Sequence, residues 1–249
     1  MANKVQTRIL IMSDTHGADF SPENRPYQRA DVALHCGDLS DGSKLVEFRS
    51  TLNMLHSIDA PLKLVNAGNH DFTMDIAACE SKVAEAIPPL EPEFVAREYG
   101  ILGQARQLFD DARHGGIVFP DEGTYRFPLE NGAILTIYAS PYTPSLGGWG
   151  FQYHPNRGRH FDINDGTDIV ITHGPPKGSW TIPTVANEQV AVIFSPPSLA
   201  LGPEFTASAI STWDWVRSWL PGNTAAAAAT MVPTSRQTIS RPSTMRTRR

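Results

Sequence analysis

The chain has 249 residues, 41% of them hydrophobic, and a formal net charge of −5 at pH 7. This length and composition suit one large domain with a sizeable core, and the negative charge argues against nucleic-acid binding. With two cysteines, no signal-peptide pattern and no apolar run long enough to span a membrane, the sequence predicts a soluble intracellular protein. We expect it to be cytoplasmic, without a disulfide framework and without a membrane or nucleic-acid partner.

Short apolar runs, each followed by a polar loop, recur along the first two thirds of the chain. Five such runs occupy residues 8–12, 32–36, 62–65, 133–139 and 168–172. Apolar runs of this length, bounded by turn residues, predict strands that are buried on both faces.

Two segments have the spacing of helices. Over 43–58 the residues on the apolar side of the expected helix are Leu45, Val46, Leu52, Leu55 and His56. A second helix is expected over 73–87, because Pro88 and Pro89 would end it. Strands that alternate with helices predict an α/β fold.

Polar blocks follow four of the predicted strands. They contain Asp14 and His16, then Asp38, then Asn69, His70 and Asp71, and finally His173. Because loops at the carboxyl ends of strands in an α/β sheet converge, we expect the four blocks to meet at one site. The stretch 141–166, rich in Gly, Pro and aromatic residues, reads as a long loop beside that site.

These residue types suit divalent metal ions. Carboxylate, imidazole and amide groups together favour Mn²⁺, Fe or Zn²⁺, and two such ions about 3.5–4 Å apart can clamp a phosphoryl group and activate water. Taken singly, each block is also typical of an ordinary turn: His173, for example, could cap a strand end. The ordered set of four blocks favours the metal site.

The blocks resemble a known family. Asp-x-His at 14–16, Gly-Asp at 37–38, Gly-Asn-His-Asp at 68–71 and Thr-His-Gly-Pro-Pro at 172–176 are similar to the motifs of calcineurin-like metallophosphoesterases. Pro-Tyr-Thr-Pro at 141–144 resembles the subgroup of metallophosphoesterase-domain-containing proteins. The resemblance covers residues 8–178 and implies a layered α-β-β-α sandwich.

The resemblance also implies a reaction and a role for each block. It implies hydrolysis of phosphodiester or phosphomonoester bonds in a small phosphorylated substrate, with cyclic nucleotides as one candidate. Asp38 would bridge two divalent ions, and His70 would orient the phosphate and protonate the leaving oxygen. The other implied metal ligands are Asp14 and His16 for the first ion and Asn69 and His173 for the second. Asp71 would brace its loop.

The family's closing motif, Gly-His-x-His, is missing. It supplies two metal-ligating histidines, and no residue after His173 is a histidine. We expect 1–178 to form the family domain and 179–249, rich in Ser, Thr, Pro and Ala, to be largely disordered, which leaves the sandwich incomplete. The two ions would then be weakly held or reduced to one. The chain would be an impaired enzyme or, alternatively, a non-catalytic protein that binds phosphate and metal.

A shift of one base offers a second interpretation of the C-terminal segment. When the last base of each codon is read with the first two of the next, Trp180–Thr181 must encode Asp and Trp213–Asp214 must encode Gly. In the same frame, the codons of Ser208–Thr212 permit Gly-His-Ile-His. The segment is therefore interpreted as a frame-shifted translation of the usual C-terminus, with an unrelated tail as the alternative.

We predict that the nucleotide sequence beneath 178–215, read one base earlier, encodes Gly-His-Ile-His without a stop codon. Resequencing of the genome and the transcript should place a single-base slip or a splice error near codons 176–180. Stop codons in that frame, or Asn or Tyr codons in place of the histidines, would leave a divergent C-terminus as the interpretation.

Overall fold

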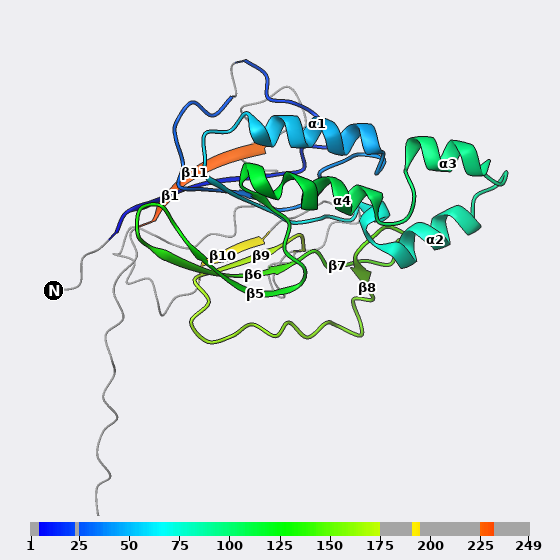
Figure 1. The fold of residues 1–249 in the computed structure, drawn as a ribbon. Helices are drawn as coiled ribbons and strands as arrows, with labels where there is room; N and C mark the ends of the chain where they lie inside the picture. The colour runs from blue at the N-terminus through cyan, green and yellow to red at the C-terminus, as the bar shows by residue number, and fades with distance from the viewer. Residues whose placement is uncertain (1–4, 23–24, 175–190, 195–224, 232–249) are drawn as a thin grey trace, which may run out of the picture.

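The molecule is built on two β-sheets that face each other (Figure 1). The computed structural model describes residues 5–22, 25–174, 191–194 and 225–231. In the first sheet the strand order is β11-β1-β2-β3-β4, with β1 to β4 parallel and β11 antiparallel to β1. Its strands are β1 (Thr7–Ser13), β2 (Val32–His35), β3 (Leu62–Val65), β4 (Ile117–Val118) and β11 (Ala225–Met231).

The second sheet is mixed. Its order is β10-β9-β6-β5, in which β6 and β9 are parallel and the other pairs antiparallel. These strands are β5 (Gly123–Pro128), β6 (Ile134–Ser140), β9 (Ile169–Thr172) and β10 (Ala191–Phe194). Strands β10 and β11 come from 179–249. The rest of that segment, and with it the frame-shift hypothesis, lies outside the described residues, so the domain boundary at 178 stays a prediction.

Helices α1 (Leu45–His56) and α4 (Gln104–Asp111) cover the outer face of the first sheet (Figure 1). Phe48 of α1 meets Phe109 of α4 edge to face, with ring centroids 6.0 Å apart. Val46 and His56, expected on the apolar side of α1, are exposed, so that part of the prediction is wrong. Among the described helices, none is both long and apolar enough to cross a lipid bilayer.

Strands β1, β2 and β3 are buried on both faces over most of their length, as their apolar runs predict. In β1, Ile9 packs in the core between the two sheets together with Ile137 of β6. Its neighbour Leu10 belongs to the core on the helical side, which includes Phe48. This alternation produces three layers of the predicted α-β-β-α sandwich and confirms the α/β fold class.

No helix covers the outer face of the second sheet in the part of the chain that is described. Instead, the chain between β8 (Gln152–Tyr153) and β9 runs along that side (Figure 1). Arg159 of this segment pairs with Glu122, the residue before β5, and its guanidinium lies 3.4 Å from the ring centroid of Tyr142. The long loop expected over 141–166 is thus anchored, and it includes the short pair formed by β7 (Thr143–Pro144) and β8.

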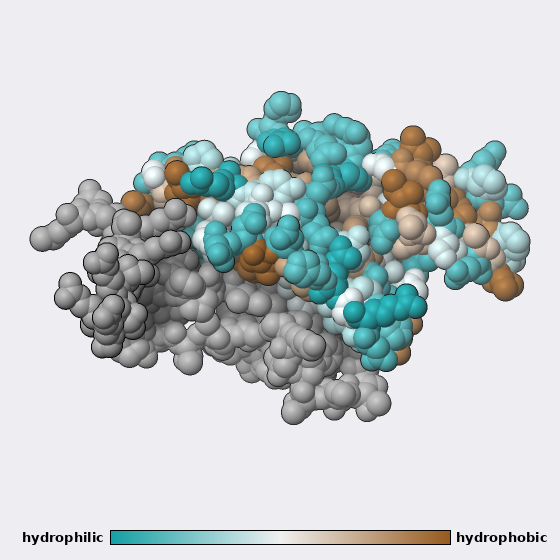
Figure 2. All heavy atoms as spheres, turned by 90° about the horizontal axis from the view of Figure 1, so that it is seen from below, coloured by the Kyte–Doolittle hydropathy of each residue, from teal (hydrophilic) through white to brown (hydrophobic). Residues whose placement is uncertain are grey.

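Helices α2 (Ile76–Ala84) and α3 (Pro92–Glu98) extend from one end of the molecule (Figure 1). Figure 2 shows apolar side chains gathered at this end, and the exposed ones in this segment are Ile76, Val83, Ile87, Leu90, Ile101 and Leu102. The only buried residue of the two helices is Cys79. The segment therefore adds little to the core.

The carboxylate of Asp71 joins the loop after β3 to the loop after β2. It is fully buried and accepts hydrogen bonds from the backbone N–H groups of Gly68 (2.8 Å), Leu39 (3.0 Å) and Ser40 (2.9 Å). The Ser40 hydroxyl donates a fourth, at 2.7 Å. Burial and the nearby charge of Asp38 raise the pKa of Asp71 to about 6, while these bonds oppose the shift. Asp71 thus braces the loops, as the sequence predicts.

We predict that Asp71→Ala lowers the free energy of unfolding by about 3 kcal/mol or more, because it leaves three buried N–H groups without an acceptor. Urea denaturation followed by circular dichroism measures this. The matched control is Asp165→Ala, at an exposed carboxylate, which should change stability by less than about 0.5 kcal/mol. Equal values for the two variants would contradict the bracing role.

Candidate metal centre

The backbone that presents the first ligands is strained. Asp14, His16 and Asp38 adopt positive φ angles of 54°, 49° and 54°, a region that costs a residue with a side chain about 1–2 kcal/mol. Two hydrogen bonds hold this shape: Asp14 N–H donates to the Gly37 carbonyl (3.0 Å) and His16 N–H donates to the Asp38 carbonyl (3.1 Å). The loops after β1 and β2 are therefore locked together, and such strain is typical of functional sites.

Three buried side chains converge at the carboxyl ends of the strands. Ligand atoms of Asp14, Asp38 and His173 all lie within 4.8 Å of one another. His173 Nε2 is 3.3 Å from Asp38 Oδ1 and 3.1 Å from Asn69 Oδ1. Four of the five predicted metal ligands thus meet at one point.

Two glycines make this close approach possible. A Cβ atom on Gly68 would lie 2.1 Å from Asp38 Oδ1, and one on Gly37 would lie 2.3 Å from His173 Nδ1. Neither distance leaves room for a side chain. The Gly-Asp and Gly-Asn-His-Asp motifs therefore need glycine where they have it.

The charges of this centre fit a divalent cation. His173 Nδ1 lies 3.1 Å from the Cys36 carbonyl, an acceptor, which directs Nε2 toward Asp38. Burial lowers the pKa of His173, but the charge of Asp38 and its hydrogen bond raise it to about 10 overall. A proton on His173 balances the charge of Asp38 in this arrangement, and a cation at the same point would take over that role.

Asp38 Oδ2 is buried and accepts no hydrogen bond from the described residues. A buried carboxylate oxygen without a donor is costly and suits a metal ligand.

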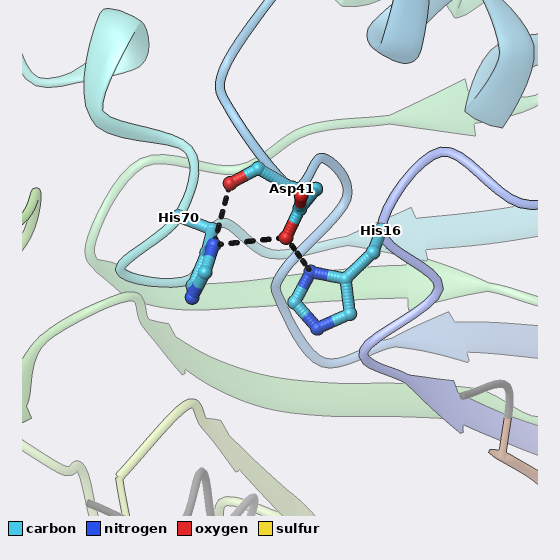
Figure 3. Close-up of side chains that lie close together, drawn as sticks. All are labelled: His16, Asp41 and His70. Atoms are coloured by element: carbon cyan, nitrogen blue, oxygen red, sulfur yellow. Dashed lines mark hydrogen bonds and ion pairs between the residues drawn. The ribbon is translucent and has the colours of Figure 1, made fainter.

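His16, Asp41 and His70 form a second cluster beside the first (Figure 3). Asp41 Oδ1 lies 3.9 Å from His16 Nδ1 and 3.7 Å from His70 Nδ1. Both Nδ1 atoms are also close to backbone carbonyls: His16 to Ser40 (3.1 Å) and His70 to Asp41 (2.6 Å). Because a carbonyl only accepts, each Nδ1 carries a proton and cannot bind a metal. This cluster therefore orients the two rings.

With Nδ1 directed at a carbonyl in both residues, Nε2 is the ring nitrogen that can act as a metal ligand or a proton donor. His16 Nε2 is 4.0 Å from Asp38 Oδ2, so His16 lies next to the buried centre, as a ligand of the first ion should. The backbone N–H of His70 donates to Asp38 Oδ1 at 2.9 Å, while its ring stays outside the ligand set. The structure thus brings all six predicted site residues together, and their individual roles stay predictions.

Sequence reasoning missed Asp41 and the backbone acceptors. Asp41 lies three residues after Asp38, where an acidic residue in a turn is unremarkable, and only its contacts with two histidines reveal a role. The Cys36 carbonyl has no sequence signal at all. His35, the last residue of β2, is buried and hydrogen-bonded to Thr15 Oγ1 at 2.9 Å, and burial lowers its pKa to about 3. It is a core residue.

Comparisons with known proteins agree with this geometry. Residues 7–202 match the family described as calcineurin-like phosphoesterase. Human metallophosphoesterase domain-containing protein 1 is 30% identical over 181 residues, which are 69% of this chain and 49% of that protein. A UPF0046 protein of Caenorhabditis elegans is 28% identical over 180 residues, 69% of this chain and 42% of its own length.

A third relative matches this chain over only a small part of its own length. The probable rhamnogalacturonate lyase C of Emericella nidulans is 28% identical over 172 residues, 68% of this chain but 14% of that protein. The chain spans about half the length, or less, of these curated relatives. The family match covers most of the chain and every loop that carries a predicted ligand. The chain therefore belongs to the calcineurin-like phosphoesterase family.

Proposed function

We propose that this chain hydrolyses phosphodiester or phosphomonoester bonds at a site for two divalent ions of the Mn, Fe or Zn class. We also propose that its activity is lower than that of a relative with a complete ligand set. The observation that carries the proposal is the buried meeting of Asp14, Asp38 and His173, in which Asp38 Oδ2 has no hydrogen-bond donor among the described residues. A small phosphorylated compound, with cyclic nucleotides as one candidate, is the proposed substrate.

The protein groups have separate tasks in this proposal. Asp14 and His16 would hold one ion, Asn69 and His173 would hold the other, and Asp38 would serve as a ligand of both. When bound, such ions polarise phosphoryl oxygens and lower the pKa of water. His70, whose Nδ1 is committed to the Asp41 carbonyl, presents Nε2 to the phosphate and donates a proton to the leaving oxygen.

A second candidate function is supported by the same site. The closing histidines are missing from the sequence, whereas Asp14, Asp38, Asn69 and His173 are already gathered at one point. This set could hold a single ion and a phosphate group without efficient turnover. The chain would then act as a phosphate- and metal-binding protein, and measurable turnover of a phosphate ester separates the two functions.

We predict at most one tightly bound ion per chain after loading with Mn²⁺ or Zn²⁺. Loss of supporting groups around a metal costs about 10–100-fold in affinity or activity, so turnover of bis(4-nitrophenyl) phosphate should be at least about tenfold below that of a frame-restored chain with both closing histidines. Elemental mass spectrometry and absorbance measure these quantities. Two ions and full turnover in the present chain would contradict the impairment.

We predict that Asp38→Ala and His70→Ala separate metal binding from proton transfer. Asp38→Ala should remove metal binding, because it deletes the carboxylate that both ions share. His70→Ala should lower kcat by about 100-fold or more on diphenyl phosphate, whose poor leaving group needs a proton. Metal content should stay the same, since the His70 backbone N–H still donates to Asp38.

The matched control for His70→Ala is His114→Ala, which removes an exposed histidine. It should leave metal content and kcat unchanged. Equal metal loss in Asp38→Ala and His70→Ala would show that the two roles are wrongly assigned.

A further inference from the structure

The imidazole of His70 is held on two sides. Its Nδ1 donates to the Asp41 carbonyl at 2.6 Å, which fixes one edge of the ring. The indole of Trp149 stacks on it, with ring centroids 4.4 Å apart and an angle of 25° between the planes. His16 meets the same imidazole edge to face, at 4.9 Å. The plane of the His70 ring is therefore defined by its neighbours.

Trp149 is attached to the loop that carries His70. The next residue, Gly150, donates its N–H to the Asn69 carbonyl at 3.0 Å. Phe151 then donates its N–H to Asp75 Oδ2 at 2.9 Å, at the N-terminus of α2. A Cβ atom on Gly150 would lie 2.7 Å from the Cα atom of Phe72, so the two segments touch through their backbones. The loop that carries Trp149 is thus joined to the loop that carries His70 through the backbone.

Two further groups hold the indole ring itself. The Phe72 ring meets it edge to face, with centroids 6.2 Å apart. The ammonium nitrogen of Lys82, on α2, lies 4.3 Å from its centroid, which is within the range of a cation–π contact. Trp149 is nevertheless 39% exposed, an unusual state for a tryptophan with this many partners. Burial alone does not explain its position.

We propose that Trp149 is a positioning residue that fixes the plane of the His70 imidazole, so that Nε2 faces the leaving oxygen of the substrate. This inference rests on the proposed phosphoesterase function. Water forms the new P–O bond and releases one of its protons to solvent. As the ester P–O bond breaks, its electron pair goes to the leaving oxygen, which takes the Nε2 proton of a His70 imidazolium that carries a proton on both ring nitrogens. Without the indole, the ring can turn about its χ2 angle and the proton donor loses its direction.

The test compares Trp149→Ala and Trp149→Phe on two phosphodiesters, with Mn²⁺ present. Diphenyl phosphate has a poor leaving group that needs a proton, whereas bis(4-nitrophenyl) phosphate has a good one that hardly needs it. Trp149→Ala should lower kcat on diphenyl phosphate by about tenfold or more, a fraction of what general acid catalysis contributes. On the nitrophenyl ester kcat should change little, and KM and metal content should stay the same. Trp149→Phe keeps an aromatic face and should retain most of the activity on both.

The matched control is Leu146→Ala, at an exposed apolar residue of the same loop. It should behave like the unaltered chain on both esters. In a His70→Ala background, Trp149→Ala should have no further effect on kcat, because the group that it positions is gone. An equal loss on both esters, or loss of metal, would overturn the proposal, since it would mean that Trp149 only supports the fold.

A second readout does not depend on activity. The ring protons of His70, identified by their absence from the NMR spectrum of His70→Ala, lie in the ring current of the indole. They should shift in Trp149→Ala and stay in place in Leu146→Ala. Unmoved signals in Trp149→Ala would overturn the positioning role. An unaltered chain that hydrolyses neither ester would overturn the proposed function instead, whatever the NMR signals show.

Discussion

The buried carboxylate of Asp38 is the point on which the rest of the site depends. It has no exposed surface, yet it contacts residues from three other loops: the His70 N–H, His173 Nε2 and, at 4.0 Å, His16 Nε2. A carboxylate can be kept away from water only if positive charge or donors surround it. The positive φ angles at Asp14, His16 and Asp38 fit this requirement, because the loops must turn sharply to bring these side chains together around the Asp38 carboxylate.

A second buried carboxylate, that of Asp71, increases the need for positive charge around Asp38. Asp71 lies close enough to Asp38 for the charge of Asp38 to raise its pKa. The hydrogen bonds that Asp71 accepts come from three loop N–H groups and the Ser40 hydroxyl. Asp71 therefore stabilises the shape of the loops but adds negative charge beside Asp38. A protonated His173 offsets part of that charge, and metal binding would offset more. The fold thus maintains a region that attracts cations.

Much of the fold could be predicted from apolar runs alone. Strands β1, β2, β3, β6 and β9 lie where such runs occur, because a strand buried on both faces needs apolar side chains throughout. Strand β5 was not predicted: its residues are half-buried or exposed, so its side chains carry no continuous apolar signal. The α2–α3 end was only partly predicted, since helices with few buried residues show little periodicity.

The sequence by itself determined which groups come together. Each predicted ligand follows a strand, and parallel strands deliver their carboxyl ends to one edge of a sheet. Only the tertiary structure decided how those groups are used. The Asp41 contacts, the Cys36 carbonyl that directs His173 and the Trp149 ring against His70 join residues from separate segments of the chain. Contacts of this kind depend on distances between loops, and local sequence patterns report only what lies along one strand or helix.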